Sequence, residues 1–501
     1  MAVINTNVAA LNSQRQLHGS EMNLQQSLRR LSSGLRINSA KDDAAGLAIA
    51  SRMSAQVSGL NQAIRNANDA ISLSQTAEGA LGKTGDLLNR IRDLAVQSAN
   101  DTNSGSDRVA LQQEVGQLQQ EVNRIANETQ FNGKNLLDGT FSAGLFQVGA
   151  NANQTVSVGM SSTKAIDMGN QNVVSSGTAG DAVAAATPAP VGTVLTNLTS
   201  TVAASTLTIQ GIKTATVDTH VNDSAGDVAA AVNRASADTG VSAVATTTAT
   251  MNITTGGTVP ATFTFDISGI NAKGTTSAHV SANITNASDL GALADAINQK
   301  SGQTGVTAIA NAGTISLKSE GGDDIQIENF TSSVPATTMD FLGDGASATA
   351  AVLTGGGNNA VRIAGTVSFN SSQSFSVTDN GANLMTTAAV NGSSLDSVGA
   401  IDVTSQSGAN DAIIVCDSAL DFVNGVRAKL GAIQNRVEST IANLAATSEN
   451  LSAARSRIQD ADFAQETASL TRAQVLQQAG MAMMAQSNAL PNQVLTLLRG
   501  G

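Results

Sequence analysis

Few side chains in this 501-residue chain lie at the spacing that catalysis or metal binding requires. The histidines His18, His220 and His279 are far apart, and none has a second ligand residue at metal-site spacing. The acidic pairs at 42–43 and 323–324 offer oxygen ligands for a hard cation, although a helix start and a solvated loop explain them more simply. The chain has no His-Glu-x-x-His, Gly-x-Ser-x-Gly or phosphate-loop motif. We therefore predict no enzyme activity, no cofactor and no metal site.

The sulfur-containing side chains suit packing better than chemistry. Cys416 is the only cysteine, so no intrachain disulfide can form. It ends the apolar run 413–416, where a thiol is typically a small buried apolar group rather than a nucleophile. Met481, Met483 and Met484 could contact a soft metal or a membrane, but such clusters more often fill a helix–helix interface.

Composition and charge exclude several classes of partner. The chain has a net charge of −12 and contains neither Trp nor Tyr, so it lacks the basic surface and the stacking aromatics of nucleic-acid binders. Residues 151–400 carry −10 of that charge, which suits a solvent-exposed middle region between nearly neutral ends. No apolar run approaches the roughly 18 residues that span a bilayer, and residues 1–6 lack the pattern of a cleavable secretory signal. We expect no nucleic acid and no membrane insertion.

Apolar heptads mark both ends of the chain but not its centre. Three runs recur at +3 and +4 steps, which places each along one face of a helix that another helix must cover. The runs are Leu24, Leu28, Leu31 and Leu35; Leu111, Val115, Leu118, Val122 and Ile125; and Val423, Val426, Leu430, Ile433 and Val437. Because hundreds of residues separate the runs, we expect the two termini to pack together, within one monomer or in a polymer.

The elements that carry these stripes follow from helix formers and turn residues. Helix formers predict helical segments over 5–35, 44–99, 106–129, 411–455 and 456–498. Ser39 and Asp42 fit a capping box at the start of the second helix. The alternating apolar residues of 141–158 predict a β-hairpin.

The central region is rich in Thr, Val, Ala and Gly, and its short alternating runs predict small β-rich domains over 176–401. A weak repeat lies inside it, in 223–245 and 287–310. The spacing from Asn233 to Gly240 equals that from Asn298 to Gly305, as a short helix followed by a strand would require. Chance similarity in a biased composition is the alternative.

Both ends of the chain resemble bacterial flagellin. The matching segments are 1–7, 31–47, 91–100, 130–137, 456–464 and 493–498. The resemblance covers about residues 1–165 and 405–501, whereas the centre matches only the general idea of a variable outer insert. The repeat is similar to a short insert motif of many flagellins.

This resemblance implies an α+β fold with nested domains. Residues 1–40 with 456–501 would form the terminal helices of a filament core, and 41–175 with 402–455 a helical bundle with a β-hairpin in the filament wall. Residues 176–401 would form the outer insert, as two small subdomains. The implied polymer interface comprises Leu24, Leu28, Leu31, Leu35, Leu470, Met481, Met484, Leu495 and Leu498.

The resemblance also implies partners and a location. The subunit would be exported by the flagellar secretion apparatus with its chaperone, would assemble with copies of itself beneath a filament cap and beyond hook-junction proteins, and would lie in the extracellular filament. Asp43 and Gly46 match an epitope of plant immune receptors. Arg90, Leu94 and Glu114 stand where the family contacts an animal Toll-like receptor, and the four-residue step from Arg90 to Leu94 places both on one helix face.

Three other classes are alternatives, of which a membrane-inserting translocator would need longer apolar helices than the sequence has. An enzyme built on flagellin ends would need a protease insert, but the insert here has no metal-binding His pair. A hook–filament junction protein shares the helical ends, yet the full set of terminal flagellin motifs favours the filament subunit. Seeded electron microscopy separates long filaments from capped stubs and from no polymer.

Overall fold

The computed structural model describes residues 6–175, 182–184, 202, 204–253, 259–271, 274–334, 337–343, 351–354, 360–381, 384–385 and 389–499. The side chains of 182–184, 270–276 and 490–499 lie outside that description, and with them those of Leu495 and Leu498.

The chain divides into two compact units. Unit 1 comprises Met1–Glu78, Phe141–Met160 and Ala428–Gly501, and unit 2 comprises Gly79–Thr140 and Ser161–Arg427. The helices α2 (Ala44–Ala99) and α8 (Gln406–Gln459) each contribute residues to both units. Helical ends and a β-rich centre confirm the predicted α+β class. The finer three-layer assignment stays a prediction.

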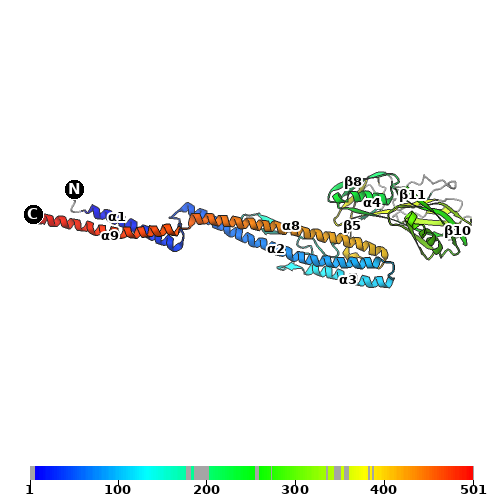
Figure 1. Cartoon of the computed structure of the whole chain (residues 1–501), viewed down its shortest axis with the longest axis horizontal. Helices are drawn as coiled ribbons and strands as arrows, with labels where there is room; N and C mark the ends of the chain where they lie inside the picture. Colours follow the sequence, from blue (N-terminus) through cyan, green and yellow to red (C-terminus); the bar gives the residue numbers. More distant parts are fainter. Residues whose placement is uncertain are drawn as a thin grey trace. The chain divides into compact units, whose positions relative to one another are not determined.

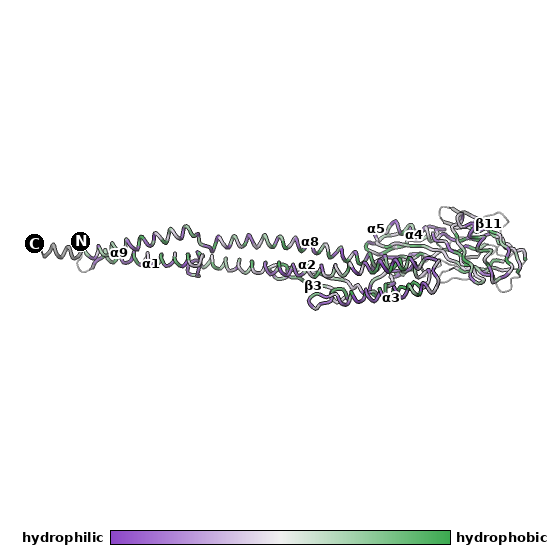
Figure 2. Tube along the Cα trace, turned by 60° about the horizontal axis from the view of Figure 1, so that its bottom comes forward, coloured by the Kyte–Doolittle hydropathy of each residue, from purple (hydrophilic) through white to green (hydrophobic). Residues whose placement is uncertain are grey.

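In unit 1, the helices α1 (Val8–Ser33) and α9 (Phe463–Arg499) lie side by side (Figures 1 and 2). Asn7 caps α1 through its side-chain oxygen, and its Nδ2 donates to the carbonyl of Ser487, which ties the two helices together. The helix α1 ends at Gly34, whose positive φ of 71° suits a residue without a Cβ. The hairpin predicted over 141–158 consists of β3 (Gly144–Gln147) and β4 (Thr155–Val158), which pair antiparallel.

The helical part of unit 2 buries part of two stripes that the sequence predicts. The helix α3 (Gly105–Glu128) begins with a capping box between Ser104 and Asp107 and buries Val115 and Val122. The strands β1 (Gln130–Phe131) and β2 (Lys134–Asn135) follow it as a small hairpin. From α2 the buried side chains include Leu81, Leu88, Ile91 and Leu94, and from α8 they include Ala412, Val415, Cys416, Ala419, Val423 and Val426.

Three sheets form the β-rich part of unit 2 in the described residues. One sheet has the order β12-β13-β9-β18-β5-β21, with β15 and β16 attached at β9; a second has the order β11-β10-β14-β17-β6; a third has the order β20-β19-β7-β8. Their bounds are β5 Gly169–Val174, β6 Ala182–Ala184, β7 Ser205–Gln210, β8 Thr214–Thr219, β9 Ser242–Ile253, β10 Ala261–Asn271, β11 Gly274–Ile284, β12 Val306–Asn311, β13 Thr314–Ser319, β14 Asp324–Ser332, β15 Thr338–Gly343, β16 Ala351–Thr354, β17 Val361–Ile363, β18 Thr366–Ser371, β19 Ser376–Asp379, β20 Val390–Gly392 and β21 Ser394–Ser397. Every one of these pairings is antiparallel.

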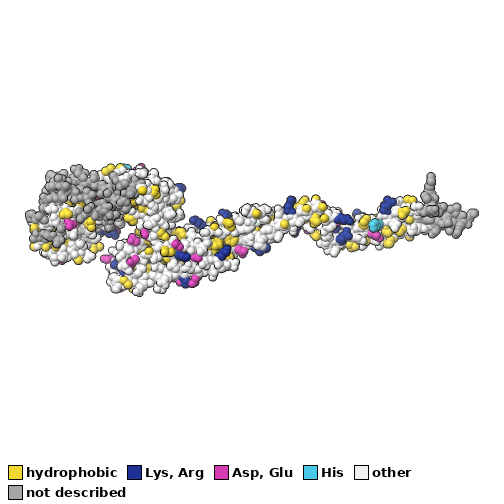
Figure 3. Space-filling view, turned by 180° about the vertical axis from the view of Figure 1, so that it is seen from behind, with side chains coloured by type: hydrophobic (Ala, Val, Ile, Leu, Met, Phe, Trp, Pro, Cys, Tyr) yellow, Lys and Arg dark blue, Asp and Glu magenta, His cyan; other side chains and the backbone are white. Residues whose placement is uncertain are grey.

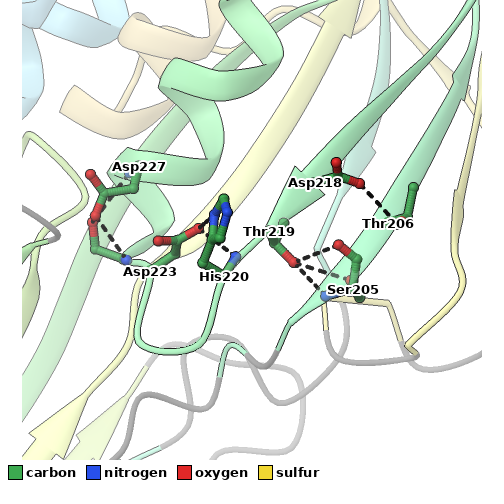
Figure 4. Close-up of polar contacts among 8 residues, drawn as sticks. Ser205, Thr206, Asp218, Thr219, His220, Asp223 and Asp227 are labelled. Atoms are coloured by element: carbon green, nitrogen blue, oxygen red, sulfur yellow. Dashed lines mark hydrogen bonds and ion pairs between the residues drawn. The ribbon is translucent and has the colours of Figure 1, made fainter.

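The segments of the predicted repeat fold alike. In the first, the hairpin β7–β8 precedes α4 (Ala225–Arg234), α5 (Ser236–Thr239) and β9; in the second, β10–β11 precedes α6 (Gly291–Asn298), α7 (Ser301–Thr304) and β12. Figure 4 shows the turn before α4 in the first repeat, where Asp223 accepts from the backbone N–H of His220. Ser224 and Asp227 then form a capping box at the start of α4. Each repeat contributes to its own cluster of buried apolar side chains, including Val228 in one and Ile297 in the other.

Two local predictions have clear outcomes. The capping box of Ser39 and Asp42 is wrong, because these residues form a turn before α2, in which Asp42 accepts from the N–H and hydroxyl of Ser39. Asp43 caps the helix instead, since its carboxylate accepts from the N–H of Gly46 at 2.9 Å. The burial of Cys416 is confirmed, and this burial raises the pKa of its thiol to about 12. Among the described residues, no helix combines the length and apolar content of a membrane span.

Candidate functional site

The helices α1 and α9 leave much of their apolar surface uncovered. Their only buried described side chains are the small residues Ser27, Ala473 and Ser487. Large apolar side chains that are about half exposed or more lie along both helices: Val8, Leu11, Met22, Leu28, Phe463, Val475, Leu476, Met481 and Met483. In unit 2, by contrast, the stripe residues Val115, Val122, Val423 and Val426 are buried within the chain. Figure 3 shows groups of apolar side chains along the narrow helical part of the chain, and the exposure of so many large apolar side chains marks a protein–protein interface.

The predicted interface residues lie on this surface to different degrees. Leu28 is 48% exposed and Met481 is 52% exposed, whereas Leu24, Leu31, Leu35, Leu470 and Met484 are half-buried. A two-helix pair therefore covers part of the stripe, and a second set of helices is needed to cover the rest.

A polar layer interrupts the apolar surface between α1 and α9. Nη1 of Arg30 lies 3.8 Å from a carboxylate oxygen of Glu466, which is 12% exposed. Both residues line a cavity of about 260 Å³ together with Ser27, Arg472 and Leu476. The Nε of Arg30 is buried there and has no hydrogen-bond partner. Sequence patterns did not indicate this layer, because its residues come from opposite ends of the chain.

The segment that joins α1 to α2 is held against the junction of α8 and α9. The backbone N–H of Arg36 donates to the carbonyl of Gln459 at 2.7 Å, and the N–H of Ala461 donates to the carbonyl of Gly34 at 2.9 Å. Hydrogen bonds from Ser39 lower the pKa of Asp42, which stabilises the turn in its charged form. Asp43 and Gly46 thus lie at the start of α2, where the carboxylate of Asp43 caps the helix.

The second predicted recognition surface is only partly exposed. Arg90 donates from Nε and Nη2 to one carboxylate oxygen of Glu114, at 3.1 and 2.7 Å, and both side chains are about half exposed. Leu94 is 1% exposed. Leu94 follows Arg90 by about one helical turn, yet its side chain is buried in unit 2, so a receptor contact through Leu94 stays a prediction. Of the three residues predicted for this surface, Arg90 and Glu114 are exposed.

Contacts that sequence reasoning missed join α2 and α3 to the start of α8. Arg92 donates from Nε to Asp417 at 2.5 Å, and this carboxylate raises the pKa of Arg92. Gln112 forms two hydrogen bonds with the segment before α8: its Nε2 donates to the carbonyl of Ile401 and its Oε1 accepts from the N–H of Val403. Gln119 donates to the carbonyl of Val398 at 2.7 Å. No local sequence pattern identifies these two glutamines, because the carbonyls that they bind lie 289 and 279 residues further along the chain.

Family models match both the ends and the centre of the chain. The bacterial flagellin N-terminal helical region matches residues 4–142, and the bacterial flagellin C-terminal helical region matches residues 413–498. The flagellin hook IN motif matches twice, over 206–257 and 264–321, which are the segments that contain the two repeats.

Relatives extend this similarity over the full length. B-type flagellin of Pseudomonas aeruginosa is 40% identical over 99% of this chain and 99% of its own length, and flagellin D of Vibrio cholerae is 34% identical over 99% and 100%. The solved structure of FliC from Burkholderia pseudomallei, 24% identical, covers 73% of this chain and 99% of its own, with a TM-score of 0.31. This chain belongs to the bacterial flagellin family, the structural subunits of the extracellular flagellar filament, and not to a family of enzymes.

Proposed function

We propose that this subunit is exported and self-assembles into the flagellar filament through the apolar surface of α1 and α9. The observation that carries the proposal is the exposure of nine large apolar side chains on two helices that bury only small residues between them. Complete burial of an exposed side chain of this size stabilises by about 1.5–3 kcal/mol, and since these side chains are about half exposed, contact with other copies supplies the remaining part of that gain.

The domain order follows from the same argument. We assign residues 1–40 with 456–501 to the filament core, 41–175 with 402–455 to the wall, and 176–401 to an outer insert, which carries most of the net negative charge. The flagellar secretion apparatus with its chaperone, the filament cap and the hook-junction proteins are the partners that this role requires.

Substitution on the core surface tests the assembly function. Leu28→Asp places a carboxylate in the proposed seam, at a cost of several kcal/mol when it is buried without a partner, and we expect no polymer after seeding. Ile309→Asp is the matched control, because Ile309 is 66% exposed in β12 of the outer insert. Sedimentation and electron microscopy of seeded protein give the readout. Filaments from Leu28→Asp, or none from Ile309→Asp, would contradict the assignment of core and insert.

We further propose that Arg90 and Glu114 form a contact with an animal innate-immune receptor, and that the helix start at Asp43 and Gly46 is read by plant receptors. The exposed, doubly hydrogen-bonded Arg90–Glu114 pair supports the first contact. We expect Arg90→Ala to weaken binding to the purified receptor ectodomain about tenfold. Lys83→Ala is the control, since Lys83 forms an exposed pair with Asp86 on the same helix. Equal binding by both variants and the parent would remove Arg90 from the contact.

A further inference from the structure

The polar layer between α1 and α9 contains more cationic groups than the chain itself neutralises. Its cavity of about 260 Å³ is lined by two arginines, Arg30 and Arg472, but by one carboxylate, that of Glu466. The other lining side chains are neutral, among them Ser20, Asn23, Gln26 and Ser469. The cavity therefore has an excess of positive charge.

One donor in this cavity has no acceptor. Arg30 is paired with Glu466 only through Nη1, at 3.8 Å, while its buried Nε makes no hydrogen bond. A buried donor without an acceptor is destabilising, and more so in a charged group. An arginine fork binds a carboxylate through two parallel N–H groups, so the free Nε is suited to a second carboxylate.

The position of the cavity indicates where that carboxylate comes from. Leu476, which lines the cavity, is 52% exposed, and the nearby Met22 and Leu28 on α1 are about half exposed. The cavity thus belongs to the surface that our proposed function buries against other copies. The helix α1 contains the three arginines Arg15, Arg29 and Arg30 but one acidic residue, Glu21. It therefore carries a net positive charge that attracts carboxylate side chains.

We propose that Arg30 and Arg472 form an anion notch that receives a carboxylate side chain from a second copy of this chain, and that this contact sets the register between neighbouring subunits. The inference rests on the proposed assembly function and adds a polar partner to its apolar seam. A single charged contact in an apolar helical seam disfavours shifted registers, because each shift leaves a charge buried without a partner.

Four variants of the full chain test the notch. Arg30→Lys keeps a charge beside Glu466 but removes the Nε donor, and Arg472→Gln removes the second cation. The double variant Arg30→Glu with Glu466→Arg exchanges the pair and leaves the net charge unchanged. Arg29→Gln is the matched control, since Arg29 is exposed on the same helix and lies outside the cavity.

The readouts are the critical concentration for seeded polymerisation and the circular dichroism of the monomer. We expect Arg30→Lys, Arg472→Gln and the exchanged pair to raise the critical concentration about tenfold, with monomer helicity unchanged and Arg29→Gln like the parent. A role confined to the Arg30–Glu466 pair within one chain predicts instead that Arg472→Gln and the exchanged pair polymerise normally, which would overturn the notch. An equal defect in Arg29→Gln would also overturn it, since general loss of positive charge would then suffice. Failure of the parent to polymerise would remove the assembly function, and the notch with it.

Discussion

At the scale of single residues, position 46 requires glycine for a reason that only the fold reveals. A Cβ on Gly46 would lie 2.7 Å from Cδ1 of Ile37, which is 2% exposed, and closer still to the carboxylate of Asp43. Any side chain must therefore displace a core residue or break the cap of α2. The sequence marked Asp43 and Gly46 only through a family resemblance, because the Ile37 contact depends on how the preceding turn folds back.

Cys416 carries a pH dependence that can be measured. Its thiol has a pKa raised from 9.0 to about 12 by burial, so the folded state favours the protonated form. The stability that this provides is present below pH 9 and is lost as the pH rises toward 12. We expect unfolding of unit 2 to become easier over this range, by up to about 1.4 kcal/mol per pH unit.

The Cys416→Ala variant is the control for this prediction, because lysines also titrate in alkaline solution. Guanidinium unfolding between pH 8 and 11, followed by circular dichroism, should give a steeper loss of stability in the parent than in the variant. Identical slopes would show that the thiol titrates normally in the folded chain. A thiol reagent at pH 8 should label the parent only after unfolding.

At the scale of elements, the two repeats share the same pair of hydrogen bonds between an asparagine side chain and the backbone of a strand. Asn233 donates to the carbonyl of Ala243 and accepts from its N–H, both at 2.8 Å. Asn298 does the same with Ala308, at 2.7 and 2.8 Å. In each repeat the amide thus joins the end of a short helix to the following strand, and a glycine with φ near 70° ends the second short helix. The equal Asn-to-Gly spacing in the sequence has this physical cause.

Removal of either amide should loosen its own repeat. We expect Asn233→Ala and Asn298→Ala each to destabilise unit 2 by about 2 kcal/mol, since the backbone groups of the strand lose two partners. Hydrogen exchange should become faster at Ala243 in the first variant and at Ala308 in the second. Asn283→Ala, at an exposed position of β11, should leave both amides protected. Exchange that changes equally in both repeats would mean that they do not fold as separate local structures.

The sequence predicted local elements well and distant contacts poorly. Helices predicted over 5–35, 44–99 and 106–129 are found at Val8–Ser33, Ala44–Ala99 and Gly105–Glu128, because apolar period, caps and turn residues act within a few residues. Strand pairing in the insert depends instead on partners far along the chain. Phe369 in β18 pairs with Val173 in β5, for example, and no local pattern specifies that register.

At the scale of the whole molecule, the segment between the insert and α8 makes contacts with the helical bundle, and a deletion that removes these contacts should destabilise the bundle. The strands β5 and β21 pair Asn172 with Ser394, so they close the insert at its base. Beyond β21, Val398, Ile401 and Val403 receive the hydrogen bonds of Gln119, Gln112 and Ser98. Residues 398–403 therefore bind α2 and α3, so the contacts of the helical bundle begin a few residues before position 402, where the proposed insert ends.

This distinction predicts the outcome of two deletions. Removal of 176–391 leaves a loop of only Ser175, Gly392 and Ser393 between β5 and β21, a length that β-hairpins commonly use. We expect this shortened chain to fold and to form filaments, because the helices remain and so do the hydrogen bonds of Gln112, Gln119 and Ser98 to the backbone before α8. Removal of 176–403 also takes the acceptors of Gln112, Gln119 and Ser98, which leaves buried polar groups without partners at about 1–3 kcal/mol each. That chain should unfold at a lower temperature and assemble poorly.

Both deletions belong in a strain without its own filament protein, with thermal unfolding of the purified monomers as the parallel measurement. Equal unfolding temperatures for the two deletions would show that the glutamine clamps contribute little to the bundle. Export of a well-folding 176–391 deletion without filaments would instead place essential subunit contacts in the insert. Because the first result concerns the monomer and the second concerns the polymer, the pair of deletions separates the stability of the bundle from the contacts of the assembled filament.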